Sequence, residues 1–218
     1  MKLQLSSPLK IPIKINQYFG ANATNVYKQE GMPGHNGIDF YAPHATPVYA
    51  CHDGRAYFQI DSAGGHGIVL ITNQPFDYQD GQAYFKTIYW HLCDSTKEPQ
   101  FKSPIQDFPW GKDVTRGDFI GYADNTGLST GDHLHFGLKP VAQGESSNSW
   151  YNVEQNNGYF GAIDPAPYFD TGLLPDLAAP KPQLTWYQKF LVGLNAAGVE
   201  WKDGKWQYVP GFAGKRYQ

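Results

Sequence analysis

Short apolar stretches alternate with clusters of turn-forming residues along most of this chain. The stretches have the length that is typical of β-strands and fall short of that of most helices. Strands are expected at residues 46–50, 54–60, 68–72, 83–92, 119–122 and 133–138. Because successive stretches lie close together in the sequence, the pattern predicts a mainly β protein built on an antiparallel sheet. The Asp53-Gly54 pair resembles a tight turn, so the first two strands are expected to form a hairpin.

Two polar segments interrupt this pattern and are expected to be long loops. Residues 21–34 lead to the first candidate site residue and are expected to form one wall of a cleft. Residues 94–112 contain three prolines and little periodicity, which indicates a surface loop. Long loops beside a site often shape its specificity, although many have no such role.

The pattern changes near residue 175. Three prolines predict a linker or strap over residues 175–183. Beyond it, apolar residues near helical spacing precede an alternating stretch around Asp203-Gly204, which predicts a small helix followed by a hairpin. The chain is therefore expected to divide into residues 1–174, 175–183 and 184–218. The last part is too short to be expected to fold around a hydrophobic core of its own.

The composition narrows the class of protein. Only 17% of the residues are charged and 16% are aromatic, and 24 glycines and 16 prolines favour short strands joined by turns. The net charge of −3 gives no indication of nucleic-acid binding. No apolar run is long enough to cross a membrane. Prolines and lysines interrupt residues 1–20, so no secretory signal is expected there, and the route of export stays open.

Two histidines stand one residue apart in the last predicted strand. In an extended chain, His133 and His135 point to the same face, while Leu134 and Phe136 point the other way, toward the core. One histidine on a strand is usually a packed or surface residue. Two on one face, after a turn rich in Gly, Ser and Thr, indicate a shared ligand or reaction centre.

Two more segments could complete a metal site. A catalytic zinc needs three protein ligands and one open position. Residues 34–40 place His35 and Asp39 four apart among glycines that let the backbone bend, and His91 ends another strand-like run. Glycine-rich loops also collect polar residues without any function. That alternative accounts for each segment alone, but not for all three in this order.

Together these segments resemble the lysostaphin-type zinc metalloendopeptidases, which cut bacterial cell-wall peptides. The resemblance covers residues 18–168, and it is carried by His35-Asn36-Gly37-Ile38-Asp39, Tyr89-Trp90-His91-Leu92 and Ser129-Thr130-Gly131-Asp132-His133-Leu134-His135-Phe136. It implies an antiparallel, sandwich-like β fold with long loops around a cleft. Many members of this family carry an acidic residue directly after the last motif, where this chain has Gly137.

The resemblance also implies a role for each site residue. His35, Asp39 and His135 would bind Zn²⁺, which lowers the pKa of a bound water and polarises a carbonyl group. His91 and His133 would stay off the metal and transfer protons or stabilise an oxyanion. The sequence does not divide these roles between the two histidines.

The implied function is that of a zinc-dependent endopeptidase that hydrolyses peptide bonds in peptidoglycan stem peptides or cross-bridges at the cell wall. One alternative is a non-catalytic wall-binding or activator module, although such relatives typically lose ligands and this chain keeps them. Another alternative is a zinc peptidase with a non-wall substrate. The C-terminal extension is either a small wall-binding module with exposed aromatic residues or a tail that packs on the first domain.

The other histidines and the two cysteines are given no role in the site. His44, His52 and His66 are expected to be turn residues, and contact of His66 with substrate at the rim of the site is the alternative. Cys51 and Cys93 are expected to be buried thiols, since no Cys-x-x-Cys pair indicates a zinc site. A disulfide between them is the alternative in an oxidising compartment.

Overall fold

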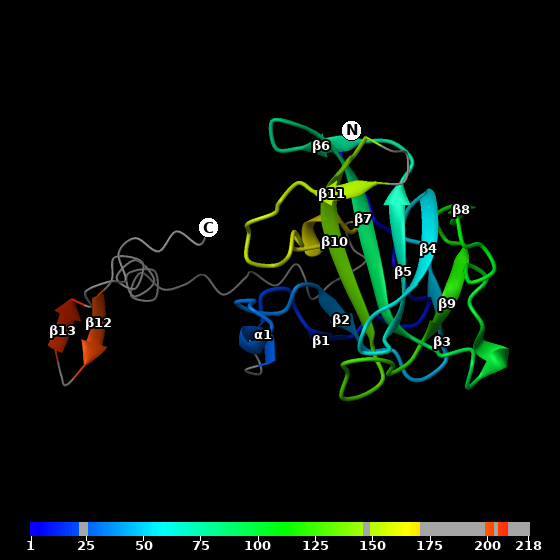
Figure 1. Cartoon of the computed structure of the whole chain (residues 1–218), viewed down its shortest axis with the longest axis horizontal. Coiled ribbons are helices and arrows are strands. Elements are labelled where there is room, and N and C mark those ends of the chain that lie inside the picture. Colours follow the sequence, from blue (N-terminus) through cyan, green and yellow to red (C-terminus); the bar gives the residue numbers. More distant parts are fainter. Residues whose placement is uncertain (22–25, 146–148, 171–198, 203–204, 209–218) are drawn as a thin grey trace. The chain divides into compact units, whose positions relative to one another are not determined.

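The computed structural model describes residues 1–21, 26–145, 149–170, 199–202 and 205–208 (Figure 1). The chain divides into two compact units, Met1–Pro175 and Asp176–Gln218, which are described separately. The proline-rich linker and the helix predicted before the terminal hairpin lie outside the described residues, so the predicted domain limits stay a prediction. Among the described residues, no helix combines the length and the apolar character that crossing a membrane requires.

Most of the elements are short strands, as the sequence pattern predicted. In chain order they are β1 (Ile15–Gln17), α1 (Val26–Gln29), β2 (Ile38–Phe40), β3 (Thr46–Tyr49), β4 (Gly54–Ile60), β5 (His66–Thr72), β6 (Phe76–Tyr78), β7 (Gly81–Leu92), η1 (Pro99–Phe101), β8 (Lys112–Val114), β9 (Phe119–Ala123), β10 (Leu134–Gln143), β11 (Trp150–Asn152), η2 (Ala166–Tyr168), β12 (Val199–Lys202) and β13 (Lys205–Tyr208).

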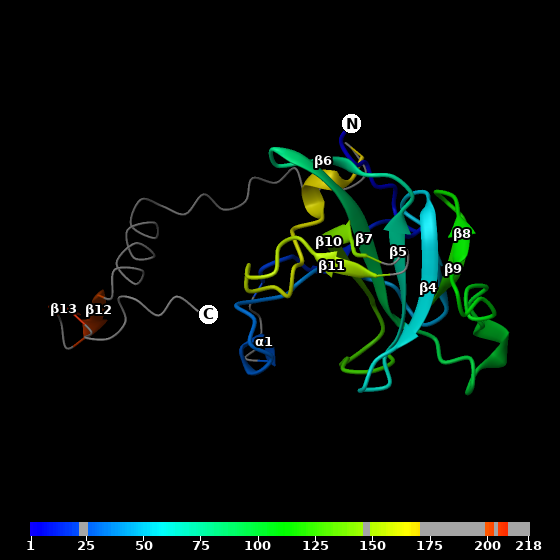
Figure 2. The ribbon, with the colours of Figure 1, turned by 45° about the horizontal axis from the view of Figure 1, so that its top comes forward.

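The first unit is built on one antiparallel sheet. The main path of strands runs β1-β2-β10-β7-β5-β4-β8, and Figure 1 shows β10, β7, β5 and β4 side by side in this order. β11 pairs with β10, β6 pairs with β7, and the β3–β9 pair joins the sheet through Leu92 and Ala123. The view in Figure 2 shows β8 beside β4 on one side of the sheet, and β10 with β11 on the other. The mainly β, antiparallel prediction is confirmed.

The strand β7 shows how the sheet acquires two different faces. Its side chains alternate, so that Phe85, Thr87 and Tyr89 are fully buried while the residues between them are partly exposed. On the buried face, the rings of Phe136 and Phe169 lie 5.3 Å apart and extend the core toward the end of the first unit. The partly exposed face is available for a cleft.

The predicted hairpin between β3 and β4 is wrong. β3 pairs with β9, whereas β4 pairs with β5 and β8. Gly54 is the first residue of β4, where a Cβ would lie 2.1 Å from the carbonyl oxygen of Ile71. The side chain of Asp53 accepts a hydrogen bond from the backbone of Arg116. The Asp53-Gly54 pair therefore allows close approach of neighbouring segments, and the same two residue types would suit a hairpin turn.

The described part of the second unit is an antiparallel strand pair. Val199 of β12 lies opposite Tyr208 of β13, and Lys202 lies opposite Lys205. This pairing confirms the predicted terminal hairpin, although its turn residues lie outside the described range.

Candidate metal centre and active site

Two neighbouring strands and one loop bring together the three predicted metal ligands. Asp39 of β2 and His135 of β10 are direct partners in the antiparallel ladder. His35 lies in the loop before β2, four residues ahead of Asp39. Gly37 lets this loop approach β10, because a Cβ at Gly37 would lie only 2.7 Å from Cε1 of His135.

The three ligand atoms form a compact triangle. His35 Nε2 lies 2.9 Å from His135 Nδ1, and Asp39 Oδ1 lies 3.1 Å from each of these nitrogens. Around a tetrahedral zinc with bonds of about 2.0–2.1 Å, ligand atoms are roughly 3.3 Å apart. Imidazole nitrogens and a carboxylate oxygen are also common zinc ligands. The donor set and its spacing therefore fit Zn²⁺.

Contacts around the triangle favour the protonation states that a metal needs. His35 Nδ1 lies 3.3 Å from the carbonyl oxygen of Tyr18, so Nδ1–H donates there and Nε2 keeps its lone pair. Burial raises the pKa of Asp39, but hydrogen bonds from His135 and His35 outweigh burial and hold that pKa below its usual range. Burial lowers the pKa of His135, which favours its neutral imidazole.

His133 lies beside the triangle. Its Nε2 is 3.6 Å from Asp39 Oδ1, and its Nδ1 is 2.7 Å from the carbonyl oxygen of Gly131. The neutral imidazole therefore donates Nδ1–H to that carbonyl and carries its lone pair on Nε2. The Ser/Thr/Gly turn recognised in the sequence thus orients the histidine that follows it.

His91 reaches the cleft through a left-handed backbone conformation, with φ of 64°. In a regular strand it would share the buried face of Tyr89, but both Trp90 and His91 line the cleft. Its Nδ1 lies 2.7 Å from the carbonyl oxygen of Thr126, and its ring centroid is 4.6 Å from that of His133. Burial lowers the pKa of His91 to about 4, so near neutral pH this imidazole also carries a lone pair on Nε2.

All five predicted site residues line one cleft of about 510 Å³. The predicted wall formed by residues 21–34 is confirmed for its described part, because Tyr27, Glu30 and Met32 line the cleft. Further lining residues come from β1, the loop before β2, the loop between β4 and β5, β7, the loop before β10 and β10 itself: Gln17, Asn36, Asp61, Ile88, Trp90, Leu128, Ser129, Thr130 and Lys139.

Sequence analysis missed the pair of Trp90 and Asp61 in the cleft wall. Trp90 Nε1–H donates to Asp61 Oδ2 at 2.9 Å, and the backbone of Gly65 donates to the other oxygen of Asp61 at 2.7 Å. The ring lies against Gly67, where a Cβ would be 1.9 Å from Trp90 Cε3. The glycine cluster is the sequence signal that could have predicted this pair, because glycine lets the Trp90 ring pack directly against the backbone.

A comparison with known protein families shows to which family this chain belongs. The sequence pattern of Peptidase family M23 matches residues 33–149, which is more than half of the chain and includes all five site residues. The chain belongs to peptidase family M23. The family consists of zinc peptidases, in agreement with the donor set of His35, Asp39 and His135.

Individual M23-like proteins match this chain over part of their length. The chain is 30% identical over 129 residues to an uncharacterized metalloprotease of Haemophilus influenzae, and 33% identical over 120 residues to the peptidoglycan DD-endopeptidase ShyA of Vibrio cholerae. These alignments cover 59% and 53% of this chain, but only 23% and 22% of the relatives. The chain thus spans less than a quarter of the length of these two proteins.

The fold of this M23 chain is that of lysostaphin. The structure of the antimicrobial peptidase lysostaphin from Staphylococcus simulans matches with a TM-score of 0.50 and 23% identity. The match covers 85% of this chain and 58% of that one. The lysostaphin-type fold expected from the sequence motifs is confirmed.

The other histidines of the M23 domain lie outside the ligand triangle, and one of them, His66, is not a turn residue. His44 is exposed, and its Nδ1 lies 2.8 Å from Asp124 Oδ1. His66 is a buried residue of β5. His52 is 4% exposed, with Nδ1 2.8 Å from the carbonyl oxygen of Asp53 and Nε2 3.0 Å from Thr87 Oγ1. The turn assignment of His66 was wrong because this residue begins β5, whereas His52 lies in the bend before β4, as expected, and is buried there.

Cys51 and Cys93 are both free and buried, which confirms the expected pair of thiols. Burial raises the pKa of each thiol to about 12, so neither is a reactive thiolate near neutral pH.

Proposed function

We propose that this chain is a zinc-dependent endopeptidase that hydrolyses peptide bonds in peptidoglycan stem peptides or cross-bridges. One observation carries the proposal: three ligand atoms within 3.1 Å of one another share a cleft with two further imidazoles, each held at Nδ1 by a backbone carbonyl oxygen. A module that had lost catalysis would have no need to keep the whole arrangement. The similarity to the peptidoglycan DD-endopeptidase ShyA supports the substrate class, and with that substrate the chain would act at the cell wall.

In this proposal His35, Asp39 and His135 hold the zinc. When bound, zinc lowers the pKa of a water molecule toward neutrality and polarises the scissile carbonyl. The chain's own contribution is to present two neutral nitrogens and one carboxylate oxygen on a rigid ladder. The β2–β10 pairing fixes Asp39 against His135, and the Tyr18 carbonyl fixes the ring of His35.

His91 and His133 are proposed to move the protons of the reaction. Hydrolysis breaks the C–N bond, adds a hydroxyl to the carbonyl carbon and delivers a proton to the amine that leaves. Carbonyl oxygens of Thr126 and Gly131 accept the Nδ1–H of the two rings and leave both Nε2 atoms as proton acceptors. One neutral imidazole that takes a proton from water becomes the acid that can protonate the amine.

Mass spectrometry of fragments released from purified cell walls tests this proposal. Walls with different cross-link chemistry are incubated with the zinc-loaded chain, with and without a zinc chelator. Chelator-sensitive fragments ending at one type of peptide bond are expected, and the His133→Ala variant should release none. Intact walls in every case, together with cleavage of an unrelated peptide, would instead support a zinc peptidase with a non-wall substrate.

A further inference from the structure

Two lysines lie side by side on the cleft face of the sheet. Lys86 of β7 and Lys139 of β10 are direct partners in the antiparallel ladder. Lys139 lines the same cleft as His135, four residues along the same strand. Cβ atoms of direct partners are about 4.5–5.5 Å apart, so two like charges in this position destabilise the sheet unless something compensates them.

No carboxylate of the described residues forms an ion pair with either lysine. The acidic residues that line the cleft are Glu30, Asp39 and Asp61; Asp39 pairs with His35 and His135, and Asp61 with Trp90 and the backbone of Gly65. Lys139 Nζ donates one hydrogen bond to the carbonyl oxygen of Phe160 at 2.7 Å, which leaves its other protons free. Burial lowers the pKa of Lys86, and burial together with Lys86 lowers the pKa of Lys139 to about 8. The two lysines are thus partly buried and have no ion-pair partner in the described part of the chain.

Uncharged residues lie between the zinc ligands and the lysines on this face of the sheet. Gly137 of β10 lies opposite Ile88 of β7, and a Cβ on Gly137 would lie 3.3 Å from the Ile88 side chain. At about 3.3 Å per residue, His135 and Lys139 are roughly 13 Å apart along the strand. An extended peptide of about four residues spans that distance.

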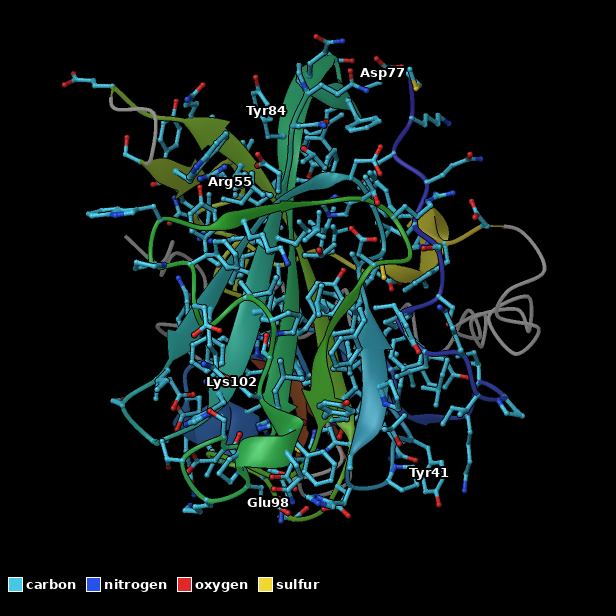
Figure 3. The ribbon with its side chains drawn as sticks, turned by 90° about the vertical axis from the view of Figure 1, so that its right-hand side faces the viewer. Tyr41, Arg55, Asp77, Tyr84, Glu98 and Lys102 are labelled. Atoms are coloured by element: carbon cyan, nitrogen blue, oxygen red, sulfur yellow. The ribbon has the colours of Figure 1, made fainter. Side chains whose placement is uncertain are left out.

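Figure 3 shows Tyr84, near the start of β7, toward the opposite end of the sheet from Glu98, which lies in the loop after β7. Lys86 therefore lies between the His91 end and the Tyr84 end of β7, and Lys139 lies beside it on β10.

We propose that Lys86 and Lys139 form a carboxylate-binding subsite, which selects peptides with a free carboxylate within about four residues of the scissile bond. This inference rests on the proposed function and narrows its substrate. A bridge made of glycine carries no side-chain carboxylate, whereas a stem peptide with acidic residues does. The subsite therefore favours stem peptides over glycine bridges.

Paired peptides test the subsite. Two peptides that contain the bond identified in the wall digest differ only in one group, a free carboxylate or the corresponding amide. Their binding is measured by calorimetry on the zinc-loaded His133→Ala chain, and their cleavage is measured with the unmodified chain. The carboxylate peptide is expected to bind and to be cleaved roughly tenfold better than the amide.

Three variants separate the subsite from a structural role. Lys86→Met makes the cleanest test, because Lys86 has no hydrogen bond to lose among the described residues. Lys139→Met also removes the bond to Phe160, and Lys139→Arg keeps the charge. The ratio of carboxylate-peptide to amide-peptide binding and cleavage should fall toward one in both Met variants. It should stay near its original value in the Arg variant. Lys112→Met, on the distant strand β8, is the matched control and should keep the full preference.

The outcomes also separate this inference from the function on which it rests. Equal binding of the two peptides by the His133→Ala chain, or an unchanged preference in Lys86→Met, would overturn the subsite. If neither peptide is cleaved but the carboxylate peptide binds better, the subsite stands and the proposed endopeptidase activity fails.

Discussion

Asp39 and His135 face each other across β2 and β10, and 3.1 Å separates Asp39 Oδ1 from His135 Nδ1. Because both side chains leave the same face of a hydrogen-bonded ladder, the sheet itself sets the spacing of two of the three proposed ligands. The third, His35, arrives from a loop that Gly37 allows to come close.

Removing any proposed ligand should empty the metal centre. His35→Ala, Asp39→Ala and His135→Ala are each expected to lose bound zinc and activity, because two protein ligands do not hold a catalytic zinc tightly. Elemental analysis of purified chains gives the zinc content, and release of wall fragments gives the activity. A zinc-free His133→Ala chain beside a zinc-loaded His135→Ala chain would show that the ligand assignment is reversed.

Removing either proposed proton carrier should have a different result. His91→Ala and His133→Ala are expected to keep most of the zinc but to lose activity by roughly 10²–10⁴-fold, which is the usual contribution of general acid–base catalysis. The same two assays apply. A variant that retains nearly full activity would remove that histidine from the mechanism.

Gly54 is predicted to be needed for the close packing of β4 against β5, because no side chain fits at this position. A Cβ there would lie 2.1 Å from the Ile71 carbonyl oxygen, so Gly54→Ala should lower the free energy of unfolding by at least about 2 kcal/mol. Urea denaturation measures this change. Gly81→Ala is the matched control, because a Cβ at Gly81 meets no atom within 4 Å. Equal stabilities of the two variants would contradict the packing argument.

His52 should make the fold sensitive to acid. Burial lowers its pKa to about 4, whereas in the unfolded chain the pKa is about 6.5. As the pH falls, the unfolded state therefore binds the proton first. The contribution of neutral His52 to the free energy of unfolding is fully present above about pH 6.5 and is lost progressively down to about pH 4. The loss from this group is about 3 kcal/mol at most.

Urea denaturation of the metal-free chain at several pH values checks this prediction, because chelation removes the separate effect of pH on zinc binding. His52→Gln should flatten the dependence of stability on pH across this interval. His44→Gln is the control: a hydrogen bond to Asp124 raises the pKa of this exposed histidine, so its removal should not flatten the acid side. An unchanged slope in His52→Gln would assign the acid sensitivity to other groups.

Much of the fold and the site could be predicted because the relevant signals are local. Short apolar stretches bounded by turn residues located β4, β5 and β7, and the spacing of His133 and His135 predicted that the two histidines share a face. The pairing of β3 was not predictable, because Asp53-Gly54 fits a turn and a close strand approach equally well. His91 on the cleft face was recognised only through its motif, since strict alternation would have buried it and its left-handed backbone leaves no pattern in the sequence. Lys86 and Lys139 were missed because only the register of β7 against β10 makes them neighbours.

The pairing of β2 with β10 also decides when, during synthesis of the chain, the ligand triangle can form. Ninety-six residues separate Asp39 from His135, so the ends of a long loop must meet before the ligand triangle exists. A chain still under synthesis carries His35 and Asp39 long before His135 has been added. Nascent chains that end before His135 therefore lack the third proposed ligand, and the triangle can form only after β10 has been made and has paired with β2.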